Sequence, residues 1–304
     1  MPLKKLLILS VCFILWLPCI LVGFEESTPW QIAVVKEMNI PEYDSAIAGF
    51  RKLLEKEKVH ARLKIFDRDE RLVVYRVKEV KPDLILTLGA TATHLISGEI
   101  KNIPIVFSMV MDPKGSNIPP TIVGASVDIP VKMQFETLKA AVPTLKSIGV
   151  VYNPTENEAV IQEARLAAND LGFILKTFPV DSEQEIPKIC ALPIDILWII
   201  PDRVVCKQVI ILRFLKSGIK NNIGVIGFTR SYAKAGALLG ISCDYEDIGR
   251  QSAEIALKIW KGESSRDLKM TAPRKVKLYI NKTVADLLGI AIPDAISKKA
   301  SEVF

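Results

Sequence analysis

The 304-residue chain has only two histidines and none of the common catalytic or nucleotide-binding motifs. His60 and His94 are too far apart in sequence to form a metal pair at helical spacing, and the GxSxG, HExxH and P-loop patterns are absent. We therefore expect no metal, no cofactor and no enzymatic activity. The alternative is an enzyme on the same fold that uses His94 as its general base, because this residue lies next to a predicted ligand-binding loop.

Cysteine is also scarce. Cys12 and Cys19 lie in the first 24 residues, which leaves Cys190, Cys206 and Cys243 as an odd and widely spaced set. Such a set is no disulfide framework, and without a CxxC pair it is no zinc site. We expect buried free thiols.

No stretch of the chain carries charge of one sign. The 40 Lys and Arg residues and the 34 Asp and Glu residues are mixed in sequence and leave a net charge of +6. No basic stripe with interleaved aromatic residues is present, so we expect no nucleic-acid partner. The 16 Gly and 18 Pro residues are scattered, and 49% of the residues are apolar, which indicates a globular chain long enough for two domains.

A long apolar run occurs only at the N-terminus. Lys4 and Lys5 precede the apolar residues 6–24, a pattern typical of an export signal, and it predicts a periplasmic or other extracytoplasmic protein. The residues before Glu25 make a poor cleavage site, and the run is nearly long enough to span a bilayer. An uncleaved N-terminal anchor is therefore the alternative.

Short apolar strands alternate with amphipathic helices from residue 30 onward. Strands are predicted at 30–36, 62–66, 84–88, 105–109, 147–152, 173–178, 196–200, 225–228, 237–241 and 274–280, and helices at 41–54, 71–80, 131–142, 158–171, 244–260 and 283–288, with one more opening at 89–93. This alternation implies right-handed crossovers and parallel sheets, an α/β fold. Ligands of such sheets bind at the carboxyl ends of the strands.

The layout of residues 81–128 recurs at residues 195–244. Three landmarks have nearly constant offsets: Asp83 and Asp195 differ by 112 positions, Asn102 and Asn222 by 120, and Gly124 and Gly240 by 116. The repeat predicts two lobes of similar build.

In the first copy of this repeat, polar side chains follow two predicted strands. Thr91 and Thr93 follow the strand 84–88. Ser108 lies at the end of the strand 105–109, and Asp112 lies in the loop after it. We predict that all four contact a ligand. The alternatives are helix caps for the threonines and a turn at Asp112. The helix that opens at 89–93 also has unpaired backbone N–H groups, which can hold an anion such as a carboxylate.

A set of motifs in the right order links the chain to a known family. The motifs are Asp44–Phe50, Lys81–Leu86, Ile103–Phe107 with Asp112 and Pro113, Ile148–Pro154, Asp247–Gln251 and Leu278–Asn281. Over roughly residues 30 to 300 the chain resembles bacterial ABC-transporter substrate-binding proteins of the tryptophan/tyrosine-uptake type. The resemblance implies a type I periplasmic binding protein, with two Rossmann-like lobes joined by three crossing segments, a ligand between the lobes and an ABC permease as partner.

The resemblance also implies boundaries. Residues 1–24 would be the signal or anchor, residues 30–127 plus 245–273 the N-terminal lobe, and residues 128–244 plus 274–304 the C-terminal lobe. The crossings would fall near Asp128, Asp244 and Arg274.

In the second lobe the resemblance adds Asn153, Asp202, Arg203, Thr229 and Arg230 as ligand contacts. At Asp202-Arg203 the relatives carry Thr-Asp-Asn, and at Thr229-Arg230 they carry Asp-Thr, whose aspartate is expected to hold an α-ammonium group. The two arginines favour a carboxylate or phosphate instead, because guanidinium pairs with both oxygens of such groups. We expect an amino acid or another small polar or anionic solute, and a membrane-tethered ligand sensor is the alternative function.

Overall fold

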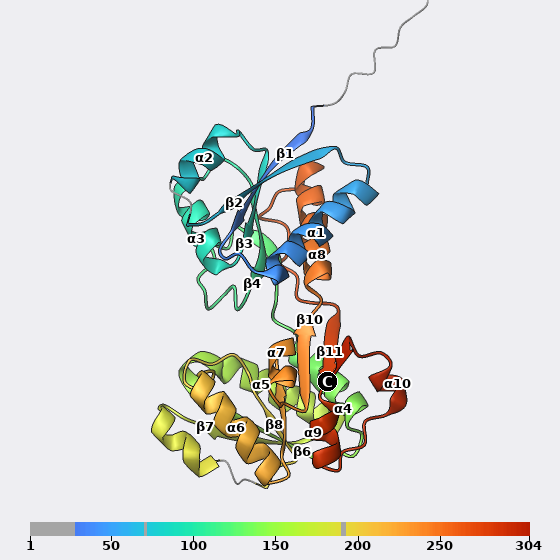
Figure 1. The fold of residues 1–304 in the computed structure, drawn as a ribbon. Coiled ribbons are helices and arrows are strands. Elements are labelled where there is room, and N and C mark those ends of the chain that lie inside the picture. The colour runs from blue at the N-terminus through green and yellow to red at the C-terminus, as the bar shows by residue number, and fades with distance from the viewer. Residues whose placement is uncertain (1–27, 70–71, 190–192) are drawn as a thin grey trace, which may run out of the picture.

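The computed structural model describes residues 28–69, 72–189 and 193–304, which form two α/β lobes connected by crossing segments (Figure 1). The predicted export signal at residues 1–24, its alternative as an anchor, and Cys190 lie outside the described residues. Within them, no helix combines the length and the apolar character needed to span a membrane. The two-lobed α/β fold predicted from the sequence is confirmed.

The first lobe is a parallel five-stranded sheet in the order β2-β1-β3-β4-β5. Its strands are β1 (Trp30–Lys36), β2 (Ala61–Asp67), β3 (Leu84–Leu88), β4 (Ile105–Val110) and β5 (Val123–Ser126). Its helices are α1 (Pro41–Lys56), α2 (Val73–Glu79), α3 (Ala90–Glu99) and α8 (Tyr245–Trp260). Strands β3 and β4 are buried along their whole length, as expected for a sheet covered on both faces.

Helices α1 and α8 lie side by side on one face of this sheet, although about 200 positions separate them in the chain (Figure 1). A Cβ atom on Gly49 would overlap the carbonyl of Glu246, and one on Gly249 would overlap the carbonyl of Ala46. Glycine at both positions therefore lets the two backbones touch. Helices α2 and α3 pack with the apolar side chains of the opposite face.

The second lobe is a seven-stranded sheet in the order β12-β11-β10-β9-β8-β6-β7, parallel except for the antiparallel pair β10 and β11. Its strands are β6 (Ser147–Tyr152), β7 (Ile174–Pro179), β8 (Ile196–Trp198), β9 (Gly224–Gly227), β10 (Leu239–Cys243), β11 (Val276–Ile280) and β12 (Glu302–Val303). Its helices are α4 (Val131–Ala141), α5 (Pro154–Leu171), the 3-10 helix η1 (Glu183–Ile189), α6 (Gln208–Lys220), α7 (Arg230–Lys234), α9 (Lys282–Leu287) and α10 (Asp294–Ser297).

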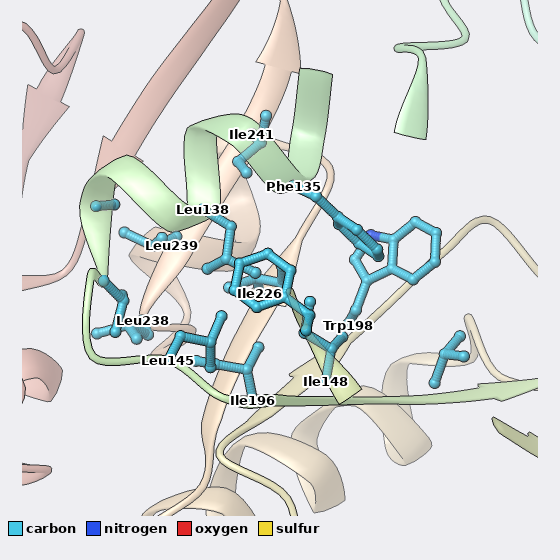
Figure 2. Packing of buried hydrophobic residues seen from close by; sticks show 14 of the residues in the cluster. Phe135, Leu138, Leu145, Ile148, Ile196, Trp198, Ile226, Leu238, Leu239 and Ile241 are labelled. Atoms are coloured by element: carbon cyan, nitrogen blue, oxygen red, sulfur yellow. The ribbon is translucent and has the colours of Figure 1, made fainter. Parts of the chain in front are cut away.

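The core of the second lobe is centred on aromatic packing between α4 and β8 (Figure 2). The ring of Phe135 meets the indole of Trp198 edge to face, with centroids 5.0 Å apart, and the indole N–H donates to Gln134 Oε1 at 3.0 Å. The buried indole thus has a hydrogen-bond partner, which removes the cost of burying its polar atom. On the other face of this sheet, side chains of α6 such as Phe214 pack in a separate cluster.

The chain passes between the lobes three times: from β5 to α4, from β10 to α8, and from α8 to β11 (Figure 1). The crossings are joined to one another, because Asp244 N–H donates to Lys275 O at 3.2 Å and Ala125 forms a β-bridge with Thr271. The carboxylate of Asp247 is buried at the start of α8 and binds Arg274 Nε at 2.8 Å and Lys275 Nζ at 3.3 Å. Asp244 caps α8, since its side chain accepts a hydrogen bond from Asp247 N–H.

Some elements differ from the sequence prediction. Helix α5 begins at Pro154 instead of residue 158, because Asn153 caps it and proline suits its first turn. Strand β8 ends at Trp198, two residues before the predicted end. The residue pattern predicts none of β5, η1, α6, α7, α10 and β12. Cys243 is a buried free thiol as expected, whereas the free thiol of Cys206 is only partly buried.

Candidate functional site

A carboxylate from β1 occupies the start of α3, where the sequence predicted an anion site. Glu37 directly follows β1, and its Oε2 and Oε1 accept hydrogen bonds of 2.9 Å from the backbone N–H and the hydroxyl of Thr91, respectively. The positive end of the α3 dipole is thus paired with a carboxylate of the protein itself. Sequence reasoning missed Glu37 because it lies 54 positions before Thr91.

Gly89 makes room for this arrangement. Its φ of 93° lies in the region that favours glycine, and a Cβ atom there would collide with Glu37 Oε2 and would stand 2.5 Å from the hydroxyl oxygen of Tyr43. Tyr43 comes from α1 and is only 5% exposed. Its hydroxyl makes no hydrogen bond with any described residue. Burial, and secondly the negative charge of Glu37, raise the pKa of Tyr43 to about 12, so the hydroxyl stays protonated at neutral pH.

Thr93 and Ser108 are both buried beside this turn, but their hydroxyls differ. Thr93 Oγ1 donates to Gly89 O at 2.7 Å and lies 2.8 Å from Thr87 Oγ1, so it holds the turn from inside the lobe. Ser108 is 1% exposed, and its hydroxyl has no partner among the described residues. The Ser108 carbonyl accepts the Gly89 N–H at 3.0 Å, which brings this serine to the same strand end.

Asp112 forms a turn next to the first crossing. Its backbone N–H lies 3.0 Å from both carboxylate oxygens of Asp128, and its own Oδ1 accepts from Gly115 N–H at 2.9 Å. Burial raises the pKa of Asp128 above its usual value. Among the described residues, no Lys, Arg or His nitrogen lies within 4.0 Å of the carboxylates of Glu37, Asp112 or Asp128. This edge of the first lobe therefore carries negative charge without a countercharge.

In the second lobe, Asp202 is a structural acceptor. It is 5% exposed, and its Oδ2 accepts from Asn153 N–H at 2.6 Å and from Asn157 Nδ2 at 2.9 Å. Its Oδ1 accepts from the N–H groups of Val204 and Val205 at 2.8 and 3.0 Å. The side chain of Asn153 caps α5 by accepting from Thr155 N–H at 3.0 Å. Asp202 and Asn153, both predicted to contact a ligand, thus hold neighbouring loops together.

Each of the two arginines is paired within the second lobe. Arg203 forms an ion pair with Glu156. Arg230 binds the carboxylate of Glu302 in a bidentate manner, with Nη2 2.6 Å from Oε1, and its guanidinium lies 5.3 Å from the ring centroid of Phe304. In this arrangement both guanidinium groups are bound to carboxylates of the chain itself. Thr229 starts α7 without a side-chain cap bond.

The alternative of a catalytic His94 has little support in the geometry. His94 is exposed on α3, and its Nε2 lies 2.6 Å from Ser116 O; no carboxylate of the described residues forms an ion pair with its ring. Across the described parts of the chain, no three His, Cys, Asp or Glu side chains are grouped as metal ligands would be.

Comparison with known protein families identifies one match over almost the whole described chain. Residues 31–304 fit the family model for ABC transporter substrate binding proteins. Among curated proteins, the tyrosine-binding protein of Clostridioides difficile strain R20291 is 25% identical over 282 residues, which cover 86% of this chain and 81% of that protein. An uncharacterized protein of Rickettsia prowazekii is 22% identical over 262 residues, with 83% of each chain covered.

Solved structures share the two-lobed fold. The ABC domain from Streptococcus pneumonia in complex with L-Trp has a TM-score of 0.62 at 21% identity, covering 91% of this chain and 100% of that one. A substrate-binding protein with adhesive properties from Clostridium difficile, in its ligand-free, open form, has a TM-score of 0.71 at 24% identity, covering 90% and 98%. Both similarities extend over both lobes.

Proposed function

The chain belongs to the family of ABC transporter substrate-binding proteins, and from this premise we propose that its ligand is a small solute with a cationic amine, in the first place an aromatic amino acid. It is a solute-binding protein of an ABC import system and acts outside the cytoplasm. The proposed partner is the permease of that system. The ligand class is suggested by the relatives, one named for tyrosine binding and one solved with L-Trp.

The observation that carries the amine is the distribution of charge at the strand ends. Glu37, Asp112 and Asp128 have no basic partner within 4.0 Å among the described residues, whereas Arg203 and Arg230 are neutralised by Glu156 and Glu302. At a partly buried site, two unit charges 4 Å apart interact by about 4 kcal/mol. Such an edge attracts a cation and repels an anionic solute, which reverses the preference that the two arginines suggested in the sequence.

We also propose the lobe boundaries given above, 30–127 plus 245–273 and 128–244 plus 274–304. They are supported by the division of the sheets and by the packing of α8 on α1. A ligand that contacts both lobes would favour a closed form by rotation about the three crossings, because only the closed form gains both sets of contacts. Residues 1–24 are proposed to be the export signal, or an anchor that keeps the protein at the membrane.

The test is a binding panel with protein purified after export, in the mature form that the cell produces. L-tyrosine, L-tryptophan and L-phenylalanine are compared with dicarboxylates, nucleosides and sugars by thermal shift, followed by calorimetry. We expect stabilisation by at least one aromatic amino acid, which should rise with the logarithm of ligand concentration above the Kd. Stabilisation by the dicarboxylates alone would overturn the proposed ligand class.

A further inference from the structure

We propose that Glu37 and Tyr43 form the subsite that binds the ammonium group of the ligand. This inference rests on the proposed function and deepens it, because it assigns the recognition of the amine to the first lobe. The two residues come from the end of β1 and the first turn of α1, and they meet at the bare backbone of Gly89.

The Glu37 carboxylate is held in one orientation before any ligand binds. The Thr91 hydroxyl binds one of its oxygens and the Thr91 N–H binds the other, each at 2.9 Å. A carboxylate accepts about four hydrogen bonds, so each oxygen keeps capacity for a further donor. The nearest base in sequence is Lys36, and its ammonium is directed to Asn39 at 3.0 Å and to Asp44 at 3.5 Å. The charge of Glu37 is therefore available to a ligand.

Tyr43 supplies the independent observation that points to a ligand. Its side chain is more than nine-tenths buried, yet its hydroxyl has no partner among the described residues and ends beside the Glu37 carboxylate at Gly89. Because this oxygen is not one of the unpaired side-chain atoms that are sealed from solvent, it is open to a partner supplied from outside the chain. The oxygen of this protonated hydroxyl can accept a hydrogen bond from an ammonium group.

Ser108 lies at the same strand end, since its carbonyl accepts the Gly89 N–H at 3.0 Å. It pairs with Leu88 in the sheet register, and its side chain therefore lies on the same face as Leu88, which packs in one cluster with Tyr43. Its hydroxyl is buried and unpaired. An ammonium group has three N–H donors, and Glu37, Tyr43 and Ser108 would offer three acceptors.

The test uses three probes that differ only in their charged groups: L-tyrosine, tyramine, which lacks the carboxylate, and 3-(4-hydroxyphenyl)propanoate, which lacks the ammonium. Affinities are measured by calorimetry for the exported wild-type protein and for the variants Glu37→Gln and Tyr43→Phe. The matched control is Glu99→Gln, which makes the same charge change at the exposed far end of α3, about 12 Å along the helix axis from Thr91.

We expect the wild type to bind L-tyrosine and tyramine better than the propanoate. Glu37→Gln should weaken L-tyrosine binding about tenfold or more, because a charge-assisted hydrogen bond becomes a neutral one, and should leave the propanoate unaffected or improved. Tyr43→Phe should weaken L-tyrosine in the same sense, and Glu99→Gln should not change it. Ligand-free melting curves establish whether each variant is folded. If Glu37→Gln does not fold, the subsite is tested with Tyr43→Phe alone.

The outcomes separate the two proposals. If the wild type binds none of the probes or other aromatic amino acids, the proposed ligand class is overturned and this subsite with it. If L-tyrosine binds equally well to the wild type and to both variants, the proposed function stands and the subsite is wrong. Tighter binding of the propanoate than of L-tyrosine would mean that a ligand carboxylate displaces Glu37 from α3, which also overturns the subsite.

Discussion

Replacing Asp202 with asparagine should destabilise the second lobe strongly, because this buried carboxylate is the shared acceptor of four donors. Each of its oxygens accepts two hydrogen bonds, from Asn153 and Asn157 on one side and from Val204 and Val205 on the other. Asparagine keeps one oxygen, so two donors would face its NH₂ group. Hydrogen bonds to a charged group contribute about 1.5–3 kcal/mol each, which predicts a loss of about 3–6 kcal/mol.

A typical domain has a free energy of unfolding of roughly 5–15 kcal/mol, so such a loss is a large part of it. Urea unfolding followed by circular dichroism measures it, and hydrogen exchange at the Val204 and Val205 amides localises it. The control is Asp170→Asn, since Asp170 is exposed and pairs with no described base except Lys132, at 3.8 Å. Its effect should stay within about 0.5 kcal/mol. A stable Asp202→Asn protein that no longer binds its ligand would refute this reasoning and make Asp202 a ligand contact.

Three further predictions concern other parts of the fold. In thermal unfolding, Gly249→Ala should lower the free energy of unfolding by about 1–3 kcal/mol, because its Cβ would overlap Ala46 O. Gly98→Ala on α3 has open space around its Cβ and should be neutral or stabilising. Asp128→Asn should gain stability relative to the wild type as the pH rises from about 3 to about 7. The raised pKa of Asp128 means that the folded wild type loses stability when this carboxyl is deprotonated. If the difference in urea midpoint between Asp128→Asn and the wild type is the same at both ends of this pH range, the prediction is wrong. Arg230→Ala should speed hydrogen exchange at the Phe304 N–H, which donates to Ile280 O at 2.8 Å. The increase should be several-fold at most, because the Arg230–Glu302 ion pair is exposed and screened by solvent. Equal exchange rates in both proteins would show that Arg230 does not hold the C-terminal strand.

Secondary structure was predictable where the residue pattern had a single reading. The continuous apolar runs of β1 and β3 are those of strands buried on both faces, and the structure has them there. Helix α6 was missed although its sequence is amphipathic: Ile210, Phe214 and Leu215 recur at helical spacing and form its buried face. The continuous apolar run at 209–212 obscures this period, because a run of that length is equally typical of a buried strand.

The site could be predicted only in outline. The rule that ligands bind at the carboxyl ends of strands directs attention to the edge that holds Thr91 and Ser108. Whether a side chain there is free depends on partners far away in sequence: Glu37 for Thr91, Glu156 for Arg203 and Glu302 for Arg230, at separations of 54, 47 and 72 positions. A glutamate in a loop has no pattern that identifies its partner, so these pairs required the fold.

The close packing of α1 on α8 also determines when the first lobe can form. A ribosome or an export channel that releases the chain from its N-terminus would release α1 about 200 residues before α8, and the second sheet needs the last residues of the chain for β12. Closing such a long loop costs entropy before any packing is gained, and contacts this distant in sequence slow folding. We expect the apolar face beneath α8 to stay uncovered until nearly all of the chain has emerged, so the first lobe can complete its core only late in synthesis or release.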